Sequence, residues 1–464
     1  MTDEQSERRG MALHTKILIG LIVGAVAGVT SNYLWSDAPQ LLWIVNNIAD
    51  PVGQIFLRML FMVVVPLVFT SLALGVAGLG DLRALGRIGG KTFGFFVLTT
   101  ALAVTLGLVL ANTLRPGDYL DPVVREGLLE TYSGDAASRI ETSQSNTFGV
   151  STFVNIVPRN PLGAAAAGDM LGLIFFTIVF GVAMTRVPPK LAQPVLTFLE
   201  GFGQAVIVMI GFAMKLAPIG VTGLIFAVTA RFGLDVLGSL SMYVIMVLLG
   251  LTVHLIFTLG GLARFLGGIP VRKFFRASRE TMITAFSTSS SNATMPTTLR
   301  AAQEELGVPR EVASFVVPLG ATMNMNGTAL FEGMTVLFLA QVFGLDLSLS
   351  TQLIVVVMSV ITAIGVAGVP GGSIPLLVMV LEMVGIPGEG IALVLGVDRI
   401  LDMARTVPNV VGDLLTSVVV TRSEGLPLVP ATAPDFSDQA ALEVTPPVIV
   451  DLPEPARVNM PGAG

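Results

Sequence analysis

Long apolar segments recur along this chain, and they restrict its fold more than any other feature. A helix that spans a membrane needs about 20 mostly apolar residues. The chain is 53% hydrophobic and only 12% charged, whereas soluble domains carry about 25% charged residues. We therefore predict an all-α polytopic membrane protein with eight transmembrane helices. The predicted spans are roughly 15–35, 52–79, 92–113, 169–187, 193–228, 236–266, 311–343 and 390–421.

Two further apolar stretches, at about 271–304 and 349–386, are interrupted in the middle. The first contains the serine-rich run 287–292 and the second the glycine-rich run 365–373. Non-helical backbone at membrane depth is tolerated only where it lines protein or a water-filled cavity. We therefore predict two re-entrant helical hairpins whose tips meet at a binding site near the midplane.

Basic residues alternate between the loops, as the positive-inside rule requires for a cytoplasmic N-terminus at 1–14. This alternation holds only if each hairpin enters and leaves on the same side. The acidic segment 118–148 is then an external loop. Residues 423–464 are rich in Pro, Asp and Glu, which predicts a disordered cytoplasmic tail. The first apolar segment has no small-residue cleavage site, which predicts an uncleaved helix.

Cysteine is absent, and the only histidines are His14 and His254. Thiol chemistry, disulfides and thiolate metal sites are therefore excluded. Two histidines are too few for a histidine-based metal site.

The last span carries charged and polar residues at helical spacing. With about 100° of rotation per residue, they fall on one face. Each charge costs about 2.5–3.5 kcal/mol at a lipid-facing helix centre on insertion scales, so this face meets protein, water or ligand. The set suits a zwitterion or an anion, because a guanidinium matches a carboxylate. An internal ion-pair network is the alternative. These residues are Asp398, Asp402, Arg405, Asn409 and Asp413.

The seventh span contains Asn324, Asn326, Gly327 and Thr328, which weaken a helix. Exposed carbonyls and amide oxygens in broken transporter helices suit Na⁺, although interhelical hydrogen bonds would use the same residues. One turn later, Glu332 is a candidate proton carrier, because burial favours the neutral form of a carboxyl group. A structural salt bridge is the alternative for Glu332.

Together these stretches resemble the glutamate transporter family, the dicarboxylate/amino-acid:cation symporters. The resemblance implies an elevator-type homotrimer of eight spans and two hairpins, with the second hairpin as the external gate. The scaffold would comprise mainly 15–80 and 149–230, and the transport domain mainly 90–113 and 236–421. The motifs that carry the resemblance are NPLGA at 160–164, SSSNATMP at 289–296, NMNGT at 324–328, AGVPG at 367–371, and 398–413.

The resemblance also implies a substrate site. Asp402 would bind the substrate amino group and Arg405 its side-chain carboxylate. The site would be completed by Thr328, Thr406, Asn409, and the backbone at Ser291 and Val369.

Three cation sites are implied in the same way. The first would use Asn324, Asn409 and Asp413 with the Gly320 carbonyl. The second would use backbone around Thr322, Met325 and 363–366. The third would use Thr99, Thr100, Asn324 and Asn326.

The chain departs from the family pattern in two places. Asn326 stands where members with the third cation site typically have Asp, so this site lacks the charge that offsets a buried cation. Coupling to fewer Na⁺ or to H⁺ is then expected, and Glu332 agrees with this, because proton-coupled members often have Glu there. Pro408 removes a backbone amide beside Arg405, and a kink there would re-aim Asn409.

The expected function is secondary-active symport of L-glutamate or L-aspartate with Na⁺ and/or H⁺ across the inner membrane. We expect no enzymatic activity, no cofactor and no nucleic-acid partner, with substrate, membrane lipid and two sister subunits as partners. A C4-dicarboxylate or neutral amino-acid symporter is the alternative. An intramembrane aspartyl protease would need a Gly-x-Gly-Asp motif, which 396–398 and 412–413 do not supply. A channel is disfavoured by the two broken hairpins, which suit alternating access.

Overall fold

The computed structural model is helical throughout its described residues, with no strand among them. Three sequence predictions lie wholly or largely outside that part of the chain. These are the N-terminal segment 1–14, the external loop 118–148 and the tail 423–464. The described residues are 13–35, 38–78, 87–120, 157–167, 169–366 and 368–429.

Five described helical stretches are long and apolar enough to cross a membrane. Their surfaces are largely open, with large apolar side chains such as Ile22 (58% exposed) and Val26 (61% exposed) facing outward. A soluble protein rarely exposes continuous apolar surface of this extent, so lipid is the natural solvent for it. The elements are α1 (Leu13–Trp35), α2 (Pro39–Ile44) with a π turn (Val45–Ala49), α3 (Asp50–Phe61) and α4 (Val64–Gly78), α6 (Arg87–Leu114), α12 (Pro189–Phe232), and α13 (Asp235–Val253) with a π turn (His254–Leu259) and α14 (Gly260–Phe265).

The other three predicted spans have a different character. The fourth is a short apolar helix, α11 (Met170–Met184). The seventh is split at Asn324–Met325 into α18 (Arg310–Met323) and α19 (Asn326–Val342). The eighth is α22 (Ala392–Ser423), which runs through Pro408 as one helix of 32 residues and buries its charged face. The polar residues therefore sit on the helices that are most enclosed by protein.

Both interrupted stretches form helix–turn–helix hairpins. The first turns at Ser289, whose φ of 50° is left-handed, and the second turns through 368–373. Serine caps the returning arm of the first hairpin, because Ser290 Oγ accepts a hydrogen bond from Ala293 N at 3.2 Å. The arms are α15 (Val271–Ala277), α16 (Arg279–Thr288), α17 (Ser291–Arg300) and a π turn (Ala301–Glu305) in the first, and α20 (Leu349–Gly365) and α21 (Ile374–Met383) in the second.

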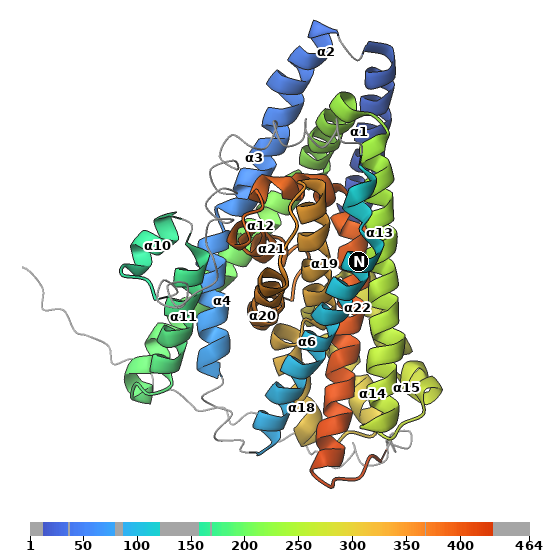
Figure 1. The fold of residues 1–464 in the computed structure, drawn as a ribbon. Helices are drawn as coiled ribbons and strands as arrows, with labels where there is room; N and C mark the ends of the chain where they lie inside the picture. The colour runs from blue at the N-terminus through green and yellow to red at the C-terminus, as the bar shows by residue number, and fades with distance from the viewer. Residues whose placement is uncertain are drawn as a thin grey trace, which may run out of the picture. The chain divides into compact units, whose positions relative to one another are not determined.

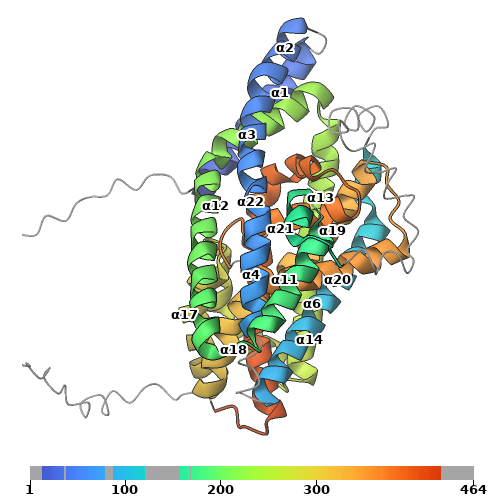
Figure 2. The ribbon, with the colours of Figure 1, turned by 90° about the vertical axis from the view of Figure 1, so that its left-hand side faces the viewer.

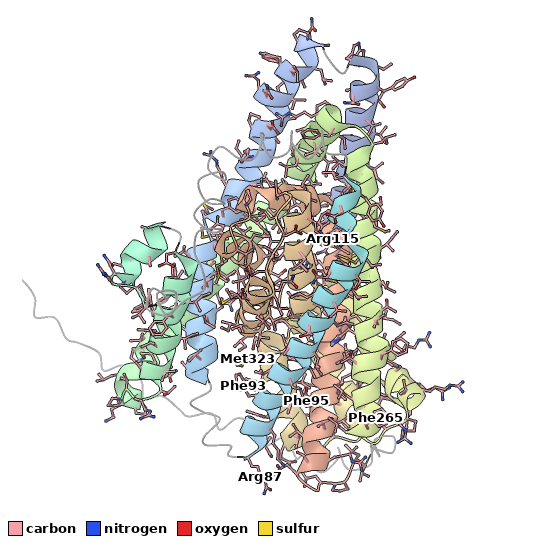
Figure 3. All side chains as sticks on the ribbon, in the orientation of Figure 1. Arg87, Phe93, Phe95, Arg115, Phe265 and Met323 are labelled. Carbon is pink, nitrogen blue, oxygen red and sulfur yellow. The ribbon has the colours of Figure 1, made fainter. Side chains whose placement is uncertain are left out.

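Helix α19 is the most enclosed element, since all of its 17 residues are buried. It packs against α6, α13, α20 and α22, which surround it in Figure 1. Separately, α1 packs along α12, and α11 lies beside α4 (Figure 2). Arg87 and Arg115 mark opposite ends of α6 (Figure 3). The remaining short helices are α10 (Pro161–Ala167) and 3-10 turns at Pro116–Tyr119 and Gly388–Ile391.

Candidate substrate and cation site

A pocket lies where the two hairpin tips meet α19 and α22. Its free space in this conformation is about 20 Å³, room for about one water molecule. Six of the seven predicted substrate residues line it, together with Ser289, Met325, Val366, Gly368 and Ser373. The six are Ser291, Thr328, Val369, Asp402, Thr406 and Asn409.

The hairpin tips are joined at one carbonyl oxygen. Ser290 Oγ donates to Gly368 O at 2.6 Å, and Asn292 N donates to the same oxygen at 3.3 Å. Gly368 is required here, because a Cβ on it would lie 2.7 Å from Ala321 O. The second tip also reaches α22, where Gly371 N donates to Asp402 Oδ2 at 3.2 Å. Asp402 therefore lies at the edge of the pocket, directly under the second hairpin.

Arg405 is the seventh predicted substrate residue, and it is held beside the pocket rather than in its lining. Its guanidinium is 1% exposed. It donates to Asp398 Oδ1 and to Asp402 Oδ1, both at 2.8 Å, and stacks 4.1 Å from the centre of the Phe331 ring. Arg399 adds a longer contact to Asp402 at 3.4 Å. The internal ion-pair network, which the sequence left open as an alternative, is thus present in this conformation.

Asn409 caps the broken seventh helix. Its Oδ1 accepts hydrogen bonds from Gly327 N at 2.7 Å and Thr328 N at 3.3 Å. Its Nδ2 donates to Thr328 Oγ1 at 3.1 Å. A side-chain oxygen that binds the free amides of a helix N-terminus stabilises that helix. The cap thus joins α22 to the start of α19, in the turn that follows Pro408.

Two residues predicted for the first cation site, Asn324 and Gly320, lie against Asp413. Asn324 Nδ2 donates to Asp413 Oδ1 at 2.8 Å, and a Cβ on Gly320 would be 2.2 Å from Asp413 Oδ1. The Asp413 carboxylate is a hard oxygen ligand that suits a small cation, whereas Asn324 turns its NH₂ group toward it in this conformation. Asn409 instead engages α19, as described. Of the residues implied for the second site, Met325 accepts a contact from Asn409 Nδ2, whereas the Thr322 side chain is exposed and donates to Leu319 O.

The third predicted cation site is a buried group of amides. Asn324 Oδ1 lies 3.4 Å from Asn326 Nδ2 and 3.5 Å from Thr99 Oγ1, and Thr100 is buried next in sequence. The sequence did not reveal that His254 faces Asn326. Within the described chain, neither His254 nitrogen nor Asn326 Oδ1 completes a hydrogen bond of good geometry. The predicted third cation site is therefore made of amide and imidazole groups. A negatively charged carboxylate, which would offset the charge of a cation, is not among these residues.

Glu332 is fully buried on α19 and has one hydrogen bond, which Thr362 Oγ1 donates to its Oε2 at 2.8 Å. Its Oε1 has no partner among the described residues. The structural salt bridge considered for Glu332 does not form with any described basic residue, because Arg405 is paired with Asp398 and Asp402. Nothing in the sequence indicated that Thr362, on the second hairpin, contacts Glu332.

Known proteins of similar sequence identify the family. The chain is 37% identical over 439 residues to the proton/sodium-glutamate symport protein of Bacillus subtilis (strain 168), covering 94% of this chain and 98% of that protein. It is 36% identical over 414 residues to the proton/glutamate-aspartate symporter of Escherichia coli (strain K12), covering 89% and 93%. It is 30% identical over 415 residues to a C4-dicarboxylate transport protein of Bacillus subtilis (strain 168), covering 89% and 95%. The pattern of the sodium:dicarboxylate symporter family matches residues 13–423. The chain therefore belongs to the sodium:dicarboxylate symporter family.

Proposed function

We propose that this protein is a secondary-active symporter of acidic amino acids, L-glutamate or L-aspartate, driven by Na⁺ and/or H⁺. The observation that carries the proposal is the pocket at the meeting point of the hairpin tips. Asp402 lies at its edge, and the buried guanidinium of Arg405 lies 2.8 Å behind that carboxylate. A carboxylate beside a guanidinium offers one partner for an ammonium group and one for a carboxylate.

In this proposal Asp402 binds the amino group and Arg405 the side-chain carboxylate of the substrate. Thr328, Thr406 and Asn409, with backbone at Ser291 and Val369, surround the rest of the molecule. Asp398 and Asp402 accept two of the five N–H donors of Arg405, so a substrate carboxylate would share the guanidinium with these acids or displace one of them. Substrate binding would thus weaken ion pairs within the protein in favour of an ion pair with the substrate.

Two lines of support favour an acidic amino acid over a plain dicarboxylate. The relatives named for glutamate or aspartate are 36–37% identical, whereas those named for C4-dicarboxylates are 30–32% identical. In addition, Asp402 at the pocket edge would repel a second carboxylate and attract an ammonium group. A C4-dicarboxylate or neutral amino-acid symporter remains the second candidate.

The coupling ions in this proposal are Na⁺ at the Asp413 site and H⁺ on Glu332. Relatives named as proton/sodium-glutamate and proton/glutamate-aspartate symporters support both ions. Asn326 supplies no negative charge at the third site, which favours fewer coupled Na⁺. The proposed assembly is an inner-membrane homotrimer with cytoplasmic termini. Each protomer would carry eight spans and two re-entrant hairpins, and its transport domain would move as an elevator.

Uptake of radiolabelled glutamate and aspartate into proteoliposomes tests the substrate assignment. Na⁺, H⁺ and K⁺ gradients are varied separately, with succinate and alanine as competitors. We expect concentrative uptake of an acidic amino acid that Arg405→Cys abolishes, while Arg115→Cys, which removes an exposed arginine, retains it. Unchanged uptake in Arg405→Cys, or stronger competition by succinate than by glutamate, would sink the assignment.

The proton assignment is tested in the same vesicles. An inward proton gradient should drive uptake by the parent protein, and Glu332→Gln should remove this drive. Uptake that Na⁺ alone drives in both proteins, with no response to pH, contradicts the assignment.

A further inference from the structure

The second hairpin contacts the buried acid of α19 through one hydroxyl group. We propose that Thr362 is a positioning residue that makes protonation of Glu332 depend on the docked position of the second hairpin. This inference rests on the proposed role of Glu332 as proton carrier and adds to it the residue that couples the proton to the gate.

The Thr362 hydroxyl has two acceptors but only one hydrogen. Its Oγ1 lies 2.8 Å from Glu332 Oε2 and 3.1 Å from the carbonyl oxygen of Ser359, one turn back on α20. A hydroxyl donates one hydrogen bond and can accept others, whereas an ionised carboxylate can only accept. Thr362 therefore cannot donate to both oxygens at once, and its hydrogen must be directed to one of them.

The charge state of Glu332 decides between the two arrangements. When Glu332 is ionised, Thr362 O–H donates to Oε2, and the Ser359 carbonyl loses this donor. When Glu332 is protonated, its O–H can donate to Thr362 Oγ1, and the Thr362 hydrogen turns to the Ser359 carbonyl. The heavy atoms stay in place while the direction of the hydrogen bond reverses. The protonated form thus makes two hydrogen bonds where the ionised form makes one.

The position of α20 controls whether these bonds exist. Thr362 is the only hydrogen-bond partner of Glu332 in the described chain, and Oε1 has none. If α20 moves away, Glu332 loses this partner in either charge state. The hydrogen bond to the charged carboxylate is the stronger one, so departure of the hairpin favours the protonated form, and docking favours release of the proton.

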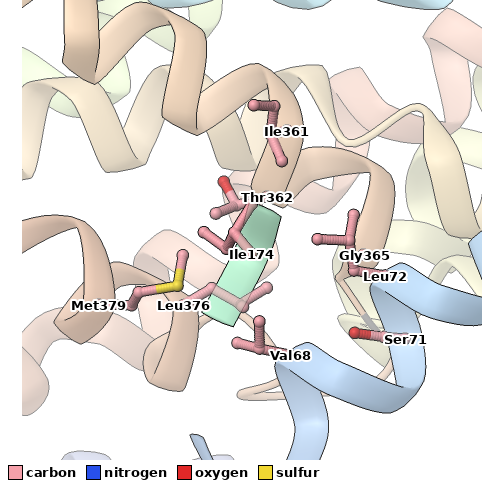
Figure 4. Close-up of a pocket in the computed structure, with 9 residues that line it drawn as sticks. All are labelled: Val68, Ser71, Leu72, Ile174, Ile361, Thr362, Gly365, Leu376 and Met379. Carbon is pink, nitrogen blue, oxygen red and sulfur yellow. The ribbon is translucent and has the colours of Figure 1, made fainter. Parts of the chain in front are cut away.

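The packing of α20 against its neighbours leaves a small gap. About 10 Å³ of free space lies between the hairpin and helices α4 and α11. Thr362 is at its boundary, opposite Val68 and Ser71 of α4 and Ile174 of α11 (Figure 4). Packing on this face is therefore incomplete, and the bond to Glu332 is the polar link that holds this turn of α20 against α19.

Few other ionisable groups compete for this role. Helix α20 carries none in its sequence. Arg405 of α22 is the charged residue that acts on Glu332 electrostatically. Other ionisable groups of the packed elements are engaged elsewhere or lie toward helix ends. Tyr243 is bonded to Thr335, His254 faces Asn326, Arg87 and Lys91 pair with Glu424, Arg399 pairs with Asp402, and Arg422 donates to Gly267 O. The acids of these elements are Asp118, Glu382, Asp398, Asp402 and Asp413.

Thr362→Val and Thr362→Ser form the matched pair for the test, because Val keeps the shape without the hydroxyl and Ser keeps the hydroxyl. Uptake by the full-length protein in proteoliposomes is measured across the pH range in which the parent responds. We expect Thr362→Ser to keep the parent's pH dependence. We expect Thr362→Val to reduce the pH-dependent change in apparent KM by about fivefold, the factor that corresponds to one lost hydrogen bond. Thr362→Ala serves as a second hydroxyl-free variant if the valine protein does not fold.

A second measurement follows the accessibility of the second hairpin to a thiol reagent. The chain has no cysteine, so Ser373→Cys on the second hairpin gives a single site for a membrane-impermeant thiol reagent. Because only the thiolate reacts, labelling at each pH is divided by that of the same cysteine in the Glu332→Gln background. This ratio should vary with pH in the parent background and lose that variation with Thr362→Val. A purely structural effect of residue 362 would change labelling equally at every pH.

Glu332→Gln distinguishes a failure of the proton-carrier proposal from a failure of the inference about Thr362. If Glu332→Gln keeps the pH dependence, the proton-carrier proposal itself fails. If Glu332→Gln removes the pH dependence while Thr362→Val keeps it, the inference about Thr362 is overturned, and Glu332 remains the proposed proton carrier. Equal loss in Thr362→Ser and Thr362→Val would also overturn it, since the hydroxyl would then be irrelevant. With the inference correct, adding Thr362→Val to Glu332→Gln changes the pH profile no further.

Discussion

Arg405 Nη1 lies 2.8 Å from Asp398 Oδ1, two turns away on the same helix. The second guanidinium nitrogen, Nη2, is held by Asp402 at the same distance. Both ends of the planar fork are therefore occupied by acids of the protein. In the proposed site, a substrate carboxylate would compete with Asp398 and Asp402 for Arg405, and the strength of those internal ion pairs would set part of the affinity for substrate.

Asp398→Asn weakens that competition. The amide keeps the size of the side chain but removes its charge, so Arg405 becomes easier to draw into the pocket. We expect the apparent KM for the acidic amino acid to fall by about three- to tenfold, since hydrogen bonds to charged groups contribute about 1.5–3 kcal/mol and the asparagine retains part of that. Initial uptake rates measure this, with Asp346→Asn at an exposed acid as the control. An unchanged or higher KM would show that Asp398 does not compete with substrate.

Asn409→Ala removes the cap of α19. The amides of Gly327 and Thr328 then lose their side-chain acceptor, and loss of an N-cap costs about 1 kcal/mol. We expect a lower midpoint of thermal unfolding in detergent and a higher KM, because Thr328 lines the pocket. Asn112→Ala, on the partly exposed side of α6, is the control. Equal stability of the two variants would argue against the cap.

Gly320→Ala probes the Asp413 site through a steric contact. The added Cβ would lie 2.2 Å from Asp413 Oδ1, so the carboxylate must move. We expect the Na⁺ concentration for half-maximal uptake to rise by about tenfold or more, equivalent to about 1.4 kcal/mol. Gly94→Ala on α6 places its Cβ in open space and should leave the Na⁺ dependence unchanged. If both variants respond alike to Na⁺, Asp413 is not the cation ligand.

Glu424→Gln tests an ionic contact between the end of α22 and the start of α6. Glu424 lies 2.6 Å from both Arg87 and Lys91. Their hydrogen bonds and charges lower the pKa of Glu424 from 4.5 to about 2. A carboxyl group with a lowered pKa in the folded state stabilises that state above its ordinary pKa, and the contribution disappears as the pH falls toward the folded value.

We therefore expect Glu424→Gln to lower the unfolding temperature at neutral pH. The difference from the parent should shrink as the pH falls from about 4.5 toward 2, and it should also shrink in high salt, which screens exposed charges. Glu311→Gln removes another exposed acid and should have little effect. A difference that is constant across pH would exclude the ionic contact as its cause.

The sequence predicted the helices and the pocket residues because local patterns determine both. Helical spacing brings Asp402, Arg405 and Asn409 to one face, and the clustered amides mark the break at Asn324–Met325, whereas Thr406, Ser291 and Val369 came from the family resemblance. Contacts between distant helices had no such local signature. The approach of His254 to Asn326 and of Thr362 to Glu332 depends on how α13 and α20 rotate against α19, and a threonine or histidine within an apolar helix does not reveal its partner.

The side-chain rotamers of the charged residues on α22 could not be predicted from the sequence pattern either. Asp398 and Asp402 lie on the same face as Arg405, and only the packed structure shows that both bind it. Pro408 illustrates the effect of tertiary packing on a local rule. A proline inside a helix usually bends or breaks it, but α22 continues through this residue because the helices around it enclose nearly all of its turns.

The carbonyl oxygen of Gly368 joins the two hairpin tips. It accepts the two hydrogen bonds found between the tips in the described chain, so one displacement of this peptide breaks both together. In the proposed transporter, a movement of the second hairpin would therefore also release the tip of the first, and the two tips would respond as one cooperative unit.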